Sequence, residues 1–414
     1  MSPSPSRRRV VALAGAAAAV VVALVSVVAV NLSNGGATKV HVAAKPTAPS
    51  SLLPIPTFAA PPSTFPSLPS SSVPTTPAPT TTAPAPTSSS TSTTVPNPCP
   101  TPHIAEYTAS AANAKPGAVT VGGDGNVWFA DWSVGAIERI KPSNPVAYAF
   151  GLPAGDHALQ LTSGPDANLW FTDPNAGAVG RMTLTGTVTE FPTPTRESNP
   201  MGVAGQTSNP LSIVAGPDGA LWFTESMADQ IGRVTLDGAI TEYPLPSRDR
   251  VHANPEGITV GPDGAVWFTE PLVGKLGRID PTSHVITEFV VGGGGGAIGG
   301  ATLVSGPDGR LWTDAVSQVE AITTKGVVTS YPVPDANAWV DAVRPDGPGG
   351  LVWVLDGRGG SLDSINAQGN VTRVMLTGPA GQGFSGDSLG MIVGPDHALW
   401  FAEGSVRRIA KLTC

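Results

Sequence analysis

The sequence predicts an all-β fold, a seven-bladed β-propeller of four-stranded blades, and three observations carry this prediction. One phrase, Gly-Pro-Asp-Gly-x-Leu-Trp-Phe-Thr-Glu, recurs along the chain, with its fullest copies at 216–225 and 261–270. The copies follow one another at roughly 40 to 50 residues, a period typical of propeller blades. The 414 residues include 49 Gly and 43 Pro, a density that excludes long helices and coiled coils. The seven repeat tryptophans are Trp128, Trp170, Trp222, Trp267, Trp312, Trp353 and Trp400.

The start of the chain has the features of an export signal. Residues 1–9 include three consecutive arginines, and a strongly apolar segment follows over 10–32. Such a segment is long enough to span a bilayer as one helix, and the positive-inside rule places residues 1–9 in the cytoplasm. We expect a single-pass transmembrane signal anchor in the cell membrane, with the remainder on the extracytoplasmic side. The arginines also resemble a twin-arginine signal, and cleavage after it would yield a secreted protein.

Residues 33–98 are expected to form a disordered stalk. Pro, Ser and Thr dominate 41–98, where Lys45 is the only formal charge. A segment this poor in apolar surface cannot offset the entropy lost on ordering, and its prolines favour an extended chain. The repeats then occupy 99–414.

Each repeat divides into four short strands, as the third copy illustrates. Asp218-Gly219 and Asp237-Gly238 are tight-turn sequences that separate the first strand from the second and the third from the fourth. The four strands are predicted at 211–214, 221–224, 231–234 and 240–243.

The repeats also predict how the ring closes. The last copy ends without a fourth strand, whereas 104–107 matches the fourth strand at 240–243. We therefore expect the N-terminal strand to complete the seventh blade, which removes two exposed strand edges. Cys99 and Cys414, the only cysteines, flank those two neighbouring strands, so an oxidising compartment favours a disulfide between them. Two unrelated free thiols are the alternative.

Charge excludes one class of partner. Residues 1–98 hold five of the 23 basic residues and none of the 31 acidic ones, so 99–414 carries a net charge of −13. A domain this acidic repels phosphate backbones, and we expect no nucleic-acid binding. We expect a monomer that binds a small molecule or a component of the cell envelope.

Long irregular connections between blades predict where a ligand binds. They all lie on the face opposite the Asp-Gly turns, and binding sites gather on such loops when a rigid scaffold holds them. The candidate ligand-face residues are His157, Arg196, Glu197, Arg248, Asp249, Arg250, His252, Glu256 and Asp387.

Near this face, an acidic residue follows the Trp-Phe segment of each repeat. Arginines of the third strands are the expected salt-bridge partners of these acids, and cation binding is the alternative. The acids are Asp131, Asp173, Glu225, Glu270, Asp314, Asp356 and Glu403. The arginines are Arg139, Arg181, Arg233, Arg278 and Arg408.

Common catalytic motifs are absent from the sequence. No serine lies in a Gly-x-Ser-x-Gly elbow, and neither His-Glu-x-x-His nor Cys-x-x-Cys occurs. The residues alone therefore predict no metal and no cofactor.

The sequence of the repeats resembles that of the virginiamycin B lyase (streptogramin lyase) family, most specifically at 222–225, 231–235 and 237–246. The resemblance covers 99–414 and implies a membrane-anchored homologue with a seven-bladed propeller. It also implies the family's activity, which linearises cyclic streptogramin B antibiotics by Mg²⁺-assisted elimination at the ester bond. Mg²⁺ is expected only if this activity is retained.

The resemblance implies histidines in Pro-His-[Ala/Gly]-Ile segments of the sixth and seventh blades, as metal ligand and base. This chain has no histidine at the position five residues before Gly-Pro-Asp, nor in the matching 339–342 segment of the sixth repeat. That position is occupied by Gly117, Leu159, Leu211, Glu256, Ala301 and Leu389. Glu403 lies near a glutamate of the family's last blade, so Glu256 and Glu403 are the candidate catalytic residues. The sequence favours a tethered ligand-binding propeller, with the carbon-oxygen lyase as the alternative.

Overall fold

The structure is a computed structural model that describes residues 99–195, 210–247, 252–291, 298–315, 317–335, 338–357, 359–376 and 390–414. The predicted cytoplasmic residues 1–9, the membrane helix over 10–32 and the stalk over 33–98 lie outside these ranges. Within them, no helix has both the length and the apolar character needed to cross a membrane.

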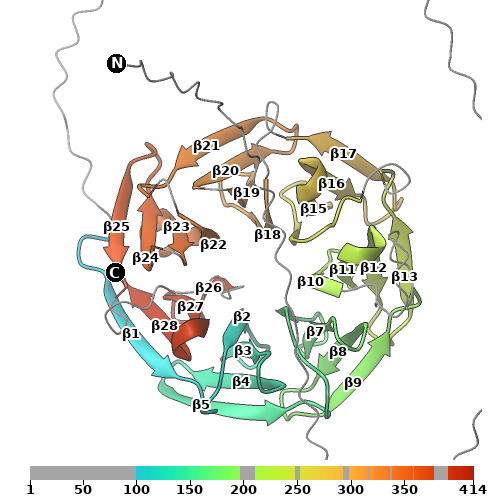
Figure 1. Cartoon of the computed structure of the whole chain (residues 1–414), viewed down its shortest axis with the longest axis horizontal. Helices are drawn as coiled ribbons and strands as arrows, with labels where there is room; N and C mark the ends of the chain where they lie inside the picture. Colours follow the sequence, from blue (N-terminus) through green and yellow to red (C-terminus); the bar gives the residue numbers. More distant parts are fainter. Residues whose placement is uncertain are drawn as a thin grey trace, which may run out of the picture. The chain divides into compact units, whose positions relative to one another are not determined.

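The described residues form seven four-stranded antiparallel sheets around a central channel, which confirms the predicted propeller (Figure 1). Blade 1 contains β2 (Pro116–Val121), β3 (Val127–Asp131), β4 (Ala136–Lys141) and β5 (Asn144–Gly151). Blade 2 contains β6 (Leu161–Ser163), β7 (Leu169–Asp173), β8 (Ala178–Met182) and β9 (Val188–Pro192). Blade 3 contains β10 (Pro210–Ala215), β11 (Leu221–Glu225), η1 (Ser226–Ala228), β12 (Gln230–Val234) and β13 (Ile240–Pro244).

The remaining blades follow the same order. Blade 4 contains β14 (Ile258–Val260), β15 (Val266–Glu270), η2 (Pro271–Val273), β16 (Lys275–Ile279) and β17 (Ile286–Val290). Blade 5 contains β18 (Ile298–Ser305), β19 (Arg310–Ala315), β20 (Gln318–Thr323) and β21 (Val328–Pro332). Blade 6 contains β22 (Val340–Gly347), η3 (Pro348–Gly350), β23 (Leu351–Asp356), β24 (Ser361–Ile365) and β25 (Val371–Met375). Blade 7 contains β26 (Met391–Val393), β27 (Leu399–Glu403), η4 (Gly404–Val406), β28 (Arg408–Thr413) and β1 (His103–Thr108).

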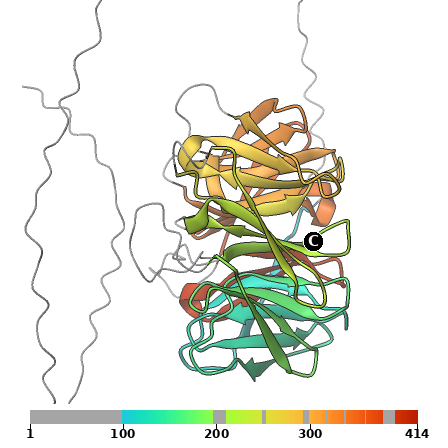
Figure 2. The same cartoon turned by 90° about the vertical axis from the view of Figure 1, so that its right-hand side faces the viewer.

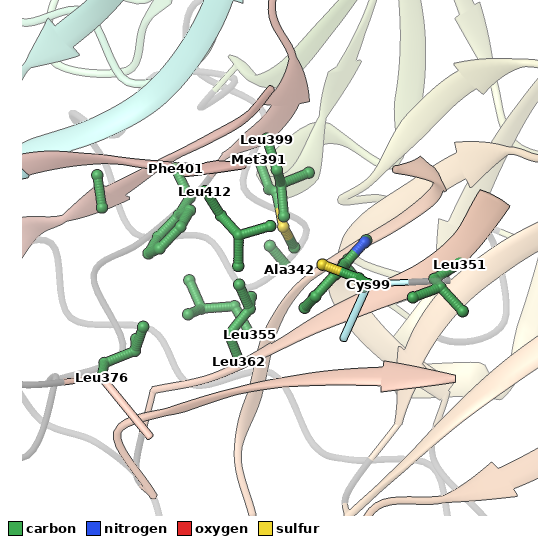
Figure 3. Packing of buried hydrophobic residues seen from close by; sticks show 12 residues of the cluster. Cys99, Ala342, Leu351, Leu355, Leu362, Leu376, Met391, Leu399, Phe401 and Leu412 are labelled. Atoms are coloured by element: carbon green, nitrogen blue, oxygen red, sulfur yellow. The ribbon is translucent and has the colours of Figure 1, made fainter. Parts of the chain in front are cut away.

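The closure of the ring is as predicted. β1 pairs antiparallel with β28, from His103 opposite Thr413 to Thr108 opposite Arg408. Cys99 and Cys414 form a disulfide across 315 residues of sequence. Cys99 is buried and packs with leucines of blades 6 and 7, as Figure 3 shows. The two ends of the domain are therefore joined by a strand pair and by a covalent bond.

One hydrogen-bonded unit explains the repeated phrase. In blade 3, Trp222 is fully buried and its indole N–H donates to Asp218 Oδ1 at 3.0 Å. Arg233 binds the other oxygen of Asp218 at 2.7 Å, and Tyr243 stacks on the indole. A Cβ on Gly216 would lie 2.4 Å from the indole, so the phrase needs glycine there. Buried tryptophan is stable only when its N–H is paired, and the turn aspartate meets this need.

The same indole-to-aspartate bond recurs in five other blades. It joins Trp128 to Asp124, Trp170 to Asp166, Trp267 to Asp263, Trp312 to Asp308, and Trp400 to Asp396. In blade 6, whose turn is longer, Trp353 donates to the carbonyl of Pro348 instead. The tryptophan position thus fixes the register of every blade, including blades 5 and 6, in which the tryptophan is not followed by Phe.

Reduction of the disulfide should destabilise the protein markedly. Loop-closure entropy for a loop of this length predicts a loss of about 4–5 kcal/mol. We expect dithiothreitol to lower the urea midpoint of the wild type and to have no effect on a Cys99→Ser, Cys414→Ser variant. Equal midpoints for the reduced and oxidised wild type would contradict the closure described above.

Asp218→Ala should lower the free energy of unfolding by about 1–3 kcal/mol, because it leaves the buried indole N–H of Trp222 without an acceptor. Asp237 provides the matched control, since it occupies the exposed second turn of the same blade. We expect Asp237→Ala to change stability by less than about 0.5 kcal/mol. Urea unfolding of the two variants checks the difference, and equal losses would refute the role given to Asp218.

Candidate functional site

The blades' innermost strands surround a cavity of about 130 Å³ in the central channel. The residues that line it come from all seven blades and include Val119, Gln160, Ser212, Ile258, Thr302, Ala342 and Met391. In the edge-on view of Figure 2, the strands run between two faces of the disc. We call the face that carries the connections between blades, and between second and third strands, the long-loop face.

Two carboxylates lie beside the first strand of blade 5, where the long-loop face meets the channel. Glu256 comes just before β14 and Asp314 belongs to β19. A Cβ on Gly300 would lie 1.7 Å from Glu256 Oε2, and one on Gly299 would lie 1.7 Å from Asp314 Oδ2. The carboxylates therefore pack on the bare backbone of two consecutive glycines, a place that a larger residue would block.

Asp314 is a correction to the predicted ring of acids. It lies two residues after its tryptophan, whereas the other six acids lie three residues after theirs. Side chains alternate along a strand, so Asp314 points to the opposite side of its sheet. Counting from the tryptophan would have revealed this shift.

A comparison with neighbouring blades shows what Asp314 replaces. At the same place in blade 4, Thr269 Oγ1 accepts the N–H of Gly257 and donates to the carbonyl of Gly300 in the next blade. Asp314 accepts the N–H of Thr302 through Oδ1 at 3.0 Å, but its carboxylate has no proton to donate onward. Asp314 therefore presents an acceptor where Thr172, Thr224 and Thr269 of blades 2 to 4 present a donor.

The acid pair has unusual electrostatics. Burial, together with the nearby charges of Glu256 and Glu320, raises the pKa of Asp314 to about 7, although the hydrogen bond from the Thr302 N–H opposes the shift. Burial also raises the pKa of Glu256, although a hydrogen bond from Asn254 opposes the change. No basic side chain of the described residues acts as a charge partner of either carboxylate. The pair can therefore hold a cation or exchange a proton near neutral pH.

The predicted salt bridges between the third-strand arginines and the ring of acids were wrong. In blade 3, Arg233 binds Asp218 in the turn and lies opposite Trp222, whereas Glu225 lies opposite Gln230. Three residues of strand, about 10 Å, separate the two positions. The same turn pairing joins Arg139 to Asp124, Arg181 to Asp166, and Arg278 to Asp263.

Blade 7 differs, because Arg408 stands directly opposite Glu403 in the sheet. The salt bridge of Arg408 nevertheless goes to Glu106 of β1. Glu403 is 1% exposed, and neither of its buried carboxylate oxygens has a hydrogen-bond partner. Burial and the nearby charge of Glu106 together raise the pKa of Glu403 to about 7, although Arg408 opposes the shift.

The two described histidines of the ligand-face set are engaged in structural contacts. A ring nitrogen of His157 contacts the carbonyl of Trp132, and its main-chain N–H donates to Asp173. His252 Nδ1 lies 2.8 Å from Asp229 Oδ2. The other predicted residues, Arg196, Glu197, Arg248, Asp249, Arg250 and Asp387, lie outside the described ranges. Of the predicted set, Glu256 is the residue that the structure places beside a second acid.

A further acidic group occurs in blade 2, where Asp156, Asp173 and Glu190 bring one oxygen each within 4.8 Å of one another. Among the described residues it is the group of three acidic, histidine or cysteine side chains that lie close enough together to hold a metal ion. Sequence reasoning missed Asp156 and Glu190, because neither belongs to the repeated phrase.

Glu403→Gln should make the protein more stable at pH 8 and less dependent on pH. A carboxyl whose folded pKa is raised binds more protons when folded, so stability falls as pH rises from about 4.5 to 7. For Glu403 this amounts to at most roughly 3 kcal/mol at about 1.4 kcal/mol per pKa unit. Urea unfolding at pH 5 and pH 8 tests this, with the exposed Asp237→Asn as control. If the free energy of unfolding of Glu403→Gln changes between pH 5 and pH 8 by as much as that of the wild type, Glu403 is not an unpaired buried carboxyl.

Comparisons with known proteins agree with the propeller fold and identify the family. The family model described as the virginiamycin B lyase family matches residues 92–208 and 203–414. A virginiamycin B lyase of Nocardia farcinica is 33% identical over 134 residues, which cover 32% of this chain and 42% of the relative. The alignment thus spans less than half the length of that curated relative.

Solved structures match over most of the propeller. A streptogramin B lyase structure has a TM-score of 0.64 at 27% identity, covering 75% of this chain and 97% of the other. A catalytically inactive virginiamycin B lyase from Staphylococcus aureus, solved with quinupristin, has a TM-score of 0.65 at 28% identity. That match covers 76% of this chain and all of the other. The chain belongs to the virginiamycin B lyase family.

Proposed function

We propose that this chain is a membrane-tethered, extracytoplasmic propeller that binds a ligand on its long-loop face, and that an amine of the ligand sits at Glu256 and Asp314. The observation that carries the proposal is this carboxylate pair, packed on Gly299 and Gly300 without a basic partner. A cationic group would supply the missing charge, and charge-assisted hydrogen bonds are the strong ones in binding sites.

Exposed apolar side chains on the same face support a small-molecule or cell-envelope ligand. Leu272 in the connection after β15 is 63% exposed, and Trp339 just before β22 is 59% exposed. Trp132, after β3, is 38% exposed. Aromatic and aliphatic side chains beside a few polar groups are the usual composition of ligand sites.

The proposed location rests on the N-terminal sequence and on the disulfide. The arginines and apolar segment before residue 33 have the pattern of a signal anchor. The Cys99–Cys414 disulfide suits an oxidising compartment outside the cytoplasm.

The alternative function is the lyase activity that the family implies. Mg²⁺-assisted elimination needs a metal site and a base. Here Glu403 has Arg408 as its neighbour in the sheet, and Asp341 stands in the sixth-blade segment where the family has a histidine. A carboxylate such as Asp341 can bind Mg²⁺, but no histidine stands in this segment to serve as the base, and we derive no catalytic step through Mg²⁺. The unpaired carboxylate of Glu403 is the observation that keeps this alternative worth testing.

Binding should depend on a positive charge in the ligand. We expect the wild type to bind glucosamine, which carries an ammonium, and not its neutral counterpart N-acetylglucosamine. Glu256→Gln or Asp314→Asn should weaken glucosamine binding about tenfold or more, whereas Asp237→Asn, which also removes one acid, should not. Ligand-observed NMR titration measures this. If both sugars bind equally, or if neither binds, the cationic site is refuted.

The same preparation tests the lyase alternative. Quinupristin is incubated with the wild type and Mg²⁺, and the products are analysed by liquid chromatography with mass spectrometry. A linear product of unchanged mass would establish elimination and overturn a binding-only function. Unchanged quinupristin would count against the lyase alternative.

A further inference from the structure

The cavity in the central channel adjoins the two carboxylates proposed above to hold an ammonium. Thr302, which lines the cavity, donates its main-chain N–H to Asp314 Oδ1 at 3.0 Å. Ile258 also lines the cavity and follows Glu256 by two residues, which is at most about 7 Å of chain. A ligand whose ammonium sits at Glu256 and Asp314 therefore places its adjoining atoms at the entrance of the cavity.

Small residues on the innermost strands leave room for a ligand in the channel. Ala342 of blade 6 and Gly390 of blade 7 line the cavity, and neither residue has the bulk to fill it. The cavity volume is about 130 Å³. A protein cavity of about 150 Å³ holds benzene, so this one accommodates a group of about five or six non-hydrogen atoms.

Three polar side chains line the same cavity. Gln160, Ser212 and Thr302 occupy equivalent places in blades 2, 3 and 5, each just before a buried apolar residue of the first strand. The hydroxyl of Thr302 donates to the main-chain carbonyl of Asp341 at 3.0 Å, and its oxygen can still accept a hydrogen bond. The hydroxyl of Ser212 can both donate and accept. The cavity therefore offers hydrogen bonds to a polar group of the ligand.

The main chain adds further hydrogen-bonding groups to the channel. The first strand of each blade has one neighbour in its sheet, and its other edge faces the channel (Figure 1). A free strand edge presents N–H and C=O groups that no sheet partner uses. An alkyl chain in the cavity would take these groups from water without replacing their hydrogen bonds, which costs free energy. Hydroxyl groups of a ligand would replace those hydrogen bonds.

We propose that the ligand is a vicinal amino alcohol, of the kind found in amino sugars and amino polyols, and that its hydroxylated end enters the channel cavity. This inference rests on the function proposed above, because the ammonium is placed at Glu256 and Asp314. The cavity then selects among cationic ligands, because it favours hydroxyl groups and disfavours alkyl groups on the carbon atoms next to the ammonium. Gln160, Ser212 and Thr302 are the side chains that determine this preference.

Two amines of the same shape test the preference. 3-Amino-1,2-propanediol carries hydroxyl groups where 2-methylbutylamine carries methyl groups, and both are cations at neutral pH. We expect ligand-observed NMR titration of the full chain to give about tenfold or more tighter binding of the diol, because the methyl groups leave polar groups of the cavity unpaired. Glu256→Gln should weaken the binding of both amines by a similar factor, because it acts on the ammonium that they share.

Ser212→Leu tests the place of the hydroxyl groups by filling the cavity. It should weaken binding of the diol about tenfold or more, and it should leave the affinity for methylammonium, which does not reach the cavity, within about twofold of the wild type. Thr189→Leu is the matched control, because Thr189 lies on the exposed outer strand of blade 2, and it should change neither affinity. Circular dichroism establishes whether Ser212→Leu folds. The comparison of the two amines in the wild type decides the matter if it does not.

The outcomes separate this inference from the function on which it rests. Equal affinities for the diol and 2-methylbutylamine, both lowered by Glu256→Gln, overturn the inference and leave the cationic site intact. The inference also fails if a folded Ser212→Leu binds the diol as tightly as the wild type does. If neither amine binds, the cationic site and the inference fail together.

Discussion

The burial of one tryptophan per blade is the constraint on which the rest of the structure depends. An indole placed between two sheets contributes a large apolar surface, but its N–H must find an acceptor there. Six blades use the aspartate of the turn four residues earlier, and blade 6 uses the carbonyl of Pro348. This bond holds the turn, the second strand and the third-strand arginine in one arrangement. Each blade therefore repeats the same register even where the sequence between the blades varies in length.

A ring of such units leaves two free strand edges unless it closes. β1 and β28 come from opposite ends of the propeller, and their pairing in blade 7 removes both edges. The disulfide keeps the two ends together when the pairing opens. A rigid, closed ring is what allows the long-loop face to carry irregular connections without loss of the fold.

Rigidity also explains how several carboxylates remain buried beneath that face. Burying these carboxylates costs free energy, and the cost differs among the blades because the charged or hydrogen-bonding group beside the acid differs from blade to blade. Lys275 and Arg373 provide a charge, Gln230 donates a hydrogen bond to Glu225, and blade 2 offers three acids together. The chain thus shares the propeller fold of the family, whereas the charged groups near the long-loop face differ from one blade to the next.

The sequence by itself determined the blade count, the strands and the closing strand, because each follows from a local pattern repeated at a regular period. It also determined the disulfide, because the only two cysteines flank the two strands that close the ring. It also identified Glu256 and Glu403 as residues of interest. It did not determine which charges meet. The turn aspartates, not the ring acids, take the arginines, because alignment along the strands separates Arg233 from Glu225 and brings it to Asp218. The pairing of Glu256 with Asp314, and of Asp156 with Glu190, joins residues from different blades or loops. Only the tertiary structure brings such residues together, since their contact depends on how blades pack and not on any spacing along the chain.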